Sequence, residues 1–139
     1  MIEDHGDTAG TSPSKTRPNI ALRWAANAGY AIVLVVMAVI PHTTVAAVSM
    51  VPDWLAHATA YGIQTGLLFW ALTPLVGVRS ALVGGLFGAV SFGAVTEVLQ
   101  VLQPGRAVEF RDVVANSVGA LVVCAVIASA AVLSSRRTG

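Results

Sequence analysis

The segment "VTEVLQVLQPGRAVEFRDVVANSVGALVV", from Val95 to Val123, places a polar region between two apolar ones. Valine, leucine, alanine and glycine dominate both ends of the segment, as in membrane helices. A proline and a glycine interrupt the helical pattern near its centre. The segment therefore predicts the end of one membrane helix, a turn and the start of another. Between the apolar ends lie the polar side chains Glu97, Gln100, Arg106, Glu109, Arg111, Asp112 and Asn116.

The composition of the whole chain agrees with a membrane environment. Of its 139 residues, 55% are hydrophobic and 11% are charged, and the mean hydropathy is +0.75. A soluble domain usually carries about 25% charged residues. The net charge of +1 argues against a nucleic-acid partner. The single cysteine, Cys124, excludes an intramolecular disulfide. We therefore expect an integral membrane protein with lipid as its main partner.

Four apolar runs, separated by prolines or charges, predict four membrane helices. Each run is close to the about 20 residues that cross about 30 Å of hydrocarbon. The short connections favour antiparallel neighbours, so the predicted fold class is all-α, a four-helix antiparallel membrane bundle. We expect this domain over residues 20–135, between a disordered tail (1–19) and a basic tail (136–139). The four runs cover approximately residues 24–40, 54–72, 81–102 and 113–133.

The basic residues predict the orientation of the bundle. Of the eight lysines and arginines, Arg106 and Arg111 fall on one side of the membrane and the other six on the side of both termini. Because basic residues accumulate on the cytoplasmic side, both termini are predicted to be cytoplasmic. An alternative is that the first run is a cleaved signal peptide followed by "TTVAAVSM". Its length exceeds the typical signal core of 7–15 residues, which favours an uncleaved helix.

The polar residues of three helices are predicted to meet near the outer surface. From Asp53 the second run carries polar residues at i, i+4 and i+8, which share one helical face. The third run has an i, i+3 pair from Glu97, and the fourth has an i, i+4 pair from Asp112. The inner half of the bundle is expected to hold almost no polar groups. The predicted cluster comprises Asp53, His57, Tyr61, Glu97, Gln100, Arg106, Asp112 and Asn116.

A purely structural role is an alternative for these residues. The two aspartates stand where a helix N-cap is expected, and the two amides fit as interhelical hydrogen-bond donors. An ionised group at the bilayer centre costs about 2.5–3.5 kcal/mol, so Glu97 needs a partner or a wet pocket. Arg106 is the expected partner. The alternative interpretation is a buried ion-pair network that only fixes helix packing.

These motifs together resemble a known family. The segments "DWLAHATAY" and "EVLQVLQPGRAVEFRDVVANSVG" are similar to the VanZ-like family of small bacterial membrane proteins, over about residues 24–133. The sequence departs from the family pattern at Trp54, often lysine there, and at Val123, often a small residue. The resemblance implies a multi-pass protein of the bacterial cytoplasmic membrane. The matching positions are Asp53, His57, Tyr61, Glu97, Gln100, Arg106, Asp112, Asn116 and Gly119.

The family resemblance implies little about chemistry, since its named member is associated with low-level teicoplanin resistance while its biochemical activity is unsettled. Three functions remain open. The first is binding of a lipid headgroup, a cell-wall precursor or a lipophilic antibiotic at the outer leaflet. The second is an enzyme acting on a lipid-linked substrate, with Glu97 and His57 as acid and base. The third is a proton-coupled carrier. No motif predicts a cofactor or a metal, although carboxylates with one histidine are able to hold a divalent ion.

Overall fold

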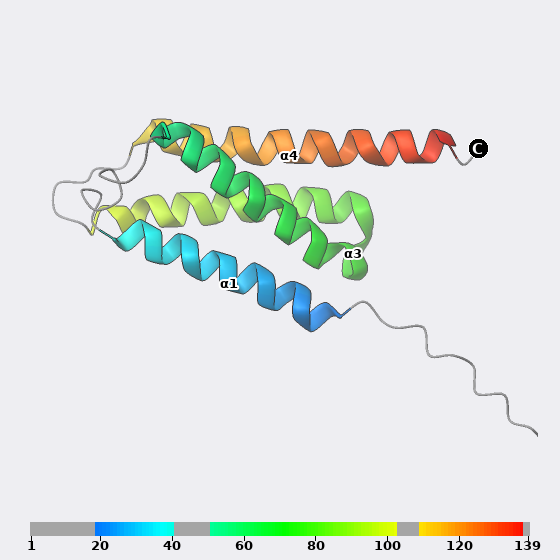
Figure 1. Ribbon diagram of the computed structural model, residues 1–139, viewed down its shortest axis with the longest axis horizontal. Helices are drawn as coiled ribbons and strands as arrows, with labels where there is room; N and C mark the ends of the chain where they lie inside the picture. Colours follow the sequence, from blue (N-terminus) through cyan, green and yellow to red (C-terminus); the bar gives the residue numbers. More distant parts are fainter. Residues whose placement is uncertain (1–18, 41–50, 103–108, 138–139) are drawn as a thin grey trace, which may run out of the picture.

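The computed structural model describes residues 19–40, 51–102 and 109–137, and its elements are all helices. Each helix is long and apolar enough to cross a membrane (Figure 1). The all-α class is therefore confirmed, and the helices indicate a membrane protein. The predicted tail 1–19 lies outside the described residues except for Asn19, whose side chain caps the first helix. The helices are α1 (Ile20–Val39), α3 (Asp53–Gln100) and α4 (Phe110–Arg137).

The two middle runs of the sequence form one helix, α3, with a sharp bend. Gly77 has φ 77° and ψ 169°, a backbone conformation open essentially to glycine alone. The bend folds residues 78–100 back beside residues 53–76 (Figure 1). A Cβ placed on Gly85 would lie 3.1 Å from the carbonyl oxygen of Thr65, so the two halves are in backbone contact. Over the described residues there are thus three helices where the sequence predicted four, because the second and third predicted runs both belong to α3 and are joined at the single non-helical residue Gly77.

The bundle has two distinct ends. One end, here called the polar end, holds the start of α3, the end of α3 and the start of α4 (Figure 1). The other end, here called the turn end, holds the Gly77 bend, the start of α1 and the end of α4. At the turn end the Arg23 guanidinium donates a 2.7 Å hydrogen bond to the carbonyl of Trp70 and lies 4.9 Å from that ring's centroid. This contact ties α1 to the first half of α3.

Glycines set how closely α4 approaches α3. A Cβ on Gly119 would stand 1.9 Å from the carbonyl oxygen of Ala58, so the helices touch backbone to backbone there. A Cβ on Gly62 would meet Val123 at 3.2 Å on the same interface. Small residues permit this approach between membrane helices. The close approach fixes the first turn of α4 opposite the first turns of α3.

Candidate functional site

Two helix starts carry the acidic groups of the polar end. Asp53 is the first residue of α3, directly after the N-cap residue Pro52. Asp112 lies in the first turn of α4, where its backbone N–H donates to the carbonyl of Glu109 at 3.0 Å. Carboxylates in a first helical turn interact favourably with the helix dipole. The expectation that both aspartates are N-caps is therefore wrong. Pro52 is the N-cap of α3, and Asp112 lies two residues inside α4.

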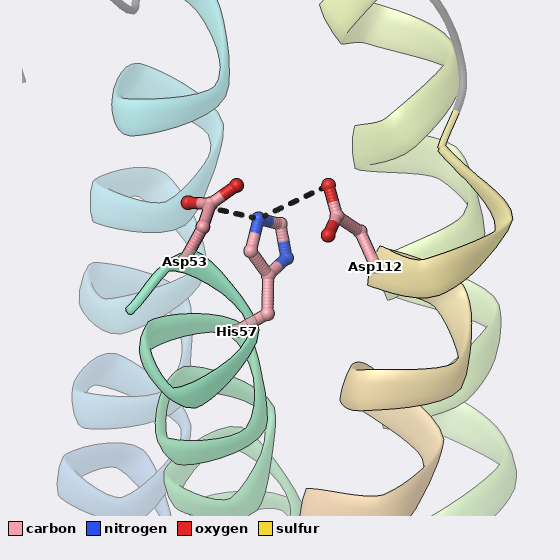
Figure 2. Close-up of side chains that lie close together, drawn as sticks. All are labelled: Asp53, His57 and Asp112. Carbon is pink, nitrogen blue, oxygen red and sulfur yellow. Dashed lines mark ion pairs between the residues drawn. The ribbon is translucent and has the colours of Figure 1, made fainter. Parts of the chain in front are cut away.

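His57 lies at the centre of the cluster. Its Nε2 is 4.0 Å from Asp53 Oδ1 and 3.7 Å from Asp112 Oδ2. Dashed lines mark these two ion pairs in Figure 2. Its Nδ1 lies 3.1 Å from Asn116 Oδ1 and 3.7 Å from Glu97 Oε1. One imidazole therefore faces groups from both halves of α3 and from α4. The structure thus brings five of the predicted side chains together at the polar end: Asp53, His57, Glu97, Asp112 and Asn116.

Burial differs strongly among these groups. The Glu97 side chain is 1% exposed and that of Asp112 is 6% exposed, whereas Asp53 is 54% exposed. His57, at 13%, lies between the buried carboxylates and the surface. The cluster is thus a shallow site, open at Asp53 and closed at Glu97.

Tyr61 is bonded one turn deeper in the bundle. Its hydroxyl hydrogen-bonds Thr96 Oγ1, and Thr96 itself donates to the carbonyl of Gly93 at 2.9 Å. Since the threonine proton is used on Gly93, the tyrosine is the donor of the pair. The Tyr61 ring also lies nearly parallel to His57, with 6.5 Å between centroids. Thr96 was not among the sequence candidates, although it directly precedes Glu97.

A cleft beside the cluster runs between α1 and the first half of α3. Its volume is about 180 Å³, and most of its wall is aliphatic. Polar groups from α3 lie along one side of it. The cleft therefore offers an apolar surface and a polar surface to the same ligand. Its lining residues are Leu34, Met37, Ala38, Ile40, Asp53, Ala56, His57, Ala60, Tyr61 and Gln100.

A second buried polar pair lies deeper than the sequence predicted. Gln64 Nε2 donates to Asn27 Oδ1 at 2.9 Å, and both residues are buried. Gln64 is seven residues beyond His57, which is about 10 Å along a helix. Thr65 is also fully buried and donates to the carbonyl of Tyr61 at 2.7 Å. Polar groups therefore extend from the polar end to the middle of the bundle. The prediction that almost all polar groups lie in the outer part of the bundle is wrong.

The remaining sequence candidates divide into two groups. Gln100 is 6% exposed and faces the cleft from the end of α3. Glu109 and Arg111, at the start of α4, are exposed. Arg106 lies outside the described residues, so its pairing with Glu97 stays a prediction.

Comparisons of the chain with protein families, with curated proteins and with solved structures find no match. The likeness to VanZ-like proteins accordingly stays a prediction based on motif order and spacing.

Proposed function

We propose that the chain is a VanZ-like protein of the bacterial cytoplasmic membrane that binds the polar head of an envelope amphiphile at the outer leaflet. The observation that carries this proposal is the cleft between α1 and α3. Its aliphatic wall suits an acyl or polyprenyl chain, while Asp53, His57, Tyr61 and Gln100 offer hydrogen-bonding groups on the other side. Lipids, lipid-linked wall precursors and lipophilic glycopeptides such as teicoplanin all combine these two chemistries.

The proposed topology has four crossings with both termini in the cytoplasm. Residues 53–76 and 78–100 of α3 would each cross once, since about 23 helical residues span about 35 Å. The distribution of arginines supports this orientation. Arg111 is the second residue of α4, at the polar end, whereas the turn end carries Arg23, Arg79, Arg136 and Arg137.

Reporter fusions test the topology. A reporter that works only outside the cytoplasm should be active at Val48 or Gly105 and inactive at Gly77 or Gly139. Activity at Gly139 would mean an odd number of crossings in the mature chain and would favour the cleaved-signal alternative. Activity at Gly77 would reverse the orientation and place the polar end in the cytoplasm.

A cleft-filling variant tests the binding function. Ala56 is exposed and lines the cleft, so Ala56→Phe should obstruct it without disturbing buried contacts. Thr59→Phe adds a ring to an exposed position of the same helix outside the cleft and is the matched control. Cells expressing Ala56→Phe should lose whatever teicoplanin tolerance the wild-type chain confers, at equal abundance in the membrane. Equal tolerance in both variants would contradict the proposal.

A membrane-embedded enzyme is the second candidate, and the position of His57 favours it. An imidazole held between the carboxylates of Glu97 and Asp112 has the arrangement of a general base oriented by acidic partners. Its substrate would again be a lipid-linked envelope compound in the cleft. Turnover separates the two functions: an enzyme converts its substrate and loses this activity in His57→Gln, whereas a binding protein shows no turnover even in the wild-type form.

A further inference from the structure

His57 Nε2 and the carboxylates of Asp53 and Asp112 are too far apart for hydrogen bonds with one another and close enough for a shared ion. The distances to Asp53 Oδ1 and Asp112 Oδ2 are 4.0 and 3.7 Å, beyond the 2.7–3.2 Å of a normal N–H···O bond. One nitrogen and one oxygen from each carboxylate lie within 4.8 Å of one another (Figure 2). Ligand atoms about 2.0–2.2 Å from a common transition-metal ion lie about 3–4 Å apart. The distances from His57 Nε2 to the two carboxylate oxygens therefore match the spacing of ligands on a common ion.

The other ring nitrogen of His57 supports this interpretation independently. The amide oxygen of Asn116 accepts hydrogen bonds only, so His57 Nδ1–H is the donor across the 3.1 Å between them. In the neutral imidazole, Nε2 then carries a lone pair aimed between two carboxylates. Metal-binding histidines commonly donate their distal N–H to such a partner, which fixes the ring and its tautomer. Asn116 is 1% exposed and anchored on α4, so the orientation is set by the interface.

We propose that Asp53, His57 and Asp112 form a binding site for a divalent transition-metal ion, joining the first turns of α3 and α4. Two carboxylate oxygens and one imidazole nitrogen favour Zn²⁺ or Mn²⁺ over Mg²⁺ and Ca²⁺, which prefer oxygen ligands throughout. Asn116 and Glu97 act as positioning residues on the Nδ1 side of the ring. This site does not depend on the proposed amphiphile binding.

The location of the site gives the ion access to solvent and to the cleft. Asp53 is 54% exposed, which provides an entry route, while His57 and Asp112 are largely buried. Asp53 and His57 also line the cleft. Three protein ligands leave at least one coordination position for an outside group. A phosphate or carboxylate oxygen of a molecule in the cleft has the chemistry to take that position.

Calorimetric titration of the full-length chain with Zn²⁺ alone tests this site. The protein is purified in detergent and stripped with a chelator before the titration. The wild-type chain should bind one Zn²⁺ in a way that a large excess of Mg²⁺ does not suppress. Asp53→Asn should weaken Zn²⁺ binding by about 100-fold or more, because it removes a ligand, and Asn116→Leu by about 10–100-fold, because it releases the imidazole. Asp53 is exposed, so its variant should fold normally.

Glu109→Gln is the matched control. It removes an exposed carboxylate at the start of α4 that belongs to no ligand group, and its Zn²⁺ affinity should equal that of the wild type. Circular dichroism and gel filtration establish that each variant is folded. Zn²⁺ should also raise the unfolding temperature of the wild type and of Glu109→Gln, but not of Asp53→Asn. No Zn²⁺ binding by the wild type, or equal loss in Asp53→Asn and Glu109→Gln, would overturn the metal site.

Discussion

The two interfaces of α3 differ in how closely the neighbouring helix approaches. At the α4 interface, a Cβ on Gly119 would stand 1.9 Å from a backbone oxygen, and α4 buries Asp112 and Asn116 against α3. At the α1 interface, Asn27 and Ala38 are the buried residues of α1, and a cleft of about 180 Å³ lies between α1 and α3. One interface is in backbone contact, and the other is loose enough to enclose a cleft.

This difference separates two roles: the α3–α4 interface positions the polar side chains, and the α1–α3 interface leaves access for a ligand. Lipid is as apolar as leucine, so helix association in a membrane depends on close packing and polar contacts rather than on hydrophobic burial. The α3–α4 interface has both, and it holds the imidazole and the carboxylates in a defined arrangement. The α1–α3 interface also has polar contacts, among them the bond from Gln64 to Asn27 and a 3.2 Å bond from the Tyr30 hydroxyl to the carbonyl of Ala60, but its cleft leaves room for a ligand.

The largest effect is expected at the backbone contact. Gly119→Ala places a methyl group where the carbonyl oxygen of Ala58 already lies. Because this neighbour is a backbone atom and not the end of a flexible side chain, it cannot move aside easily. Overpacking typically costs about 1–3 kcal/mol and occasionally more, and we expect about 3 kcal/mol or more here. The measurement is reversible unfolding of the purified chain in mixed detergent micelles. Zn²⁺ affinity should fall together with stability, since α4 carries Asp112.

A small loss of stability in Gly119→Ala would contradict the comparison. A cost below about 1 kcal/mol would mean that α4 shifts freely along α3, so that the interface does not position the polar groups. Gly66→Ala is the internal control, since its added Cβ would be 3.8 Å from Val123, an ordinary contact. We expect Gly66→Ala to change the unfolding free energy much less than Gly119→Ala.

Helical periodicity explains why much of the candidate site was predictable from sequence. Spacings of i, i+4 place Asp53 above His57 and Asp112 above Asn116 in any α-helix. Short connections then bring these faces to one end of the bundle. The sequence did not show which face of α4 packs against α3. The structure shows that the face carrying Gly119 does so, in backbone contact with Ala58.

Features that depend on a distant partner were not predictable in the same way. Thr96 bonds Tyr61, and Gln64 bonds Asn27, across pairs of residues 35 and 37 positions apart. A threonine or glutamine inside an apolar run gives no sequence signal of which helix it will face. The bend at Gly77 is a similar case. The sequence predicted a loop between the second and third runs, whereas in the structure only Gly77 departs from helical geometry inside α3.

A moderate effect is expected for the Tyr61–Thr96 hydrogen bond, which joins the two halves of α3 beneath His57. Tyr61→Phe removes the donor while keeping the ring, and should cost about 1 kcal/mol. Hydrogen bonds between membrane helices average about 0.6 kcal/mol and reach about 1.7 kcal/mol, so this value lies within the measured range. In a double-mutant cycle with Thr96→Val, the two losses should not add. Full additivity would mean that the bond does not hold the halves together.

The smallest effect is expected in α1, at Gly29. The residue is exposed in the middle of the helix, and an added Cβ meets no atom within 4 Å. Gly29→Ala should therefore leave packing unchanged and stabilise the helix by up to about 1 kcal/mol, the difference in helix propensity between the two residues. Combined with Gly119→Ala, its effect should be additive, because the two sites share no contact. If Gly29→Ala were destabilising in the same micelle assay, α1 would pack through Gly29 against another surface. A contact on that face would hold α1 in place from its outer side, and the contrast with the tightly packed α4 would fail.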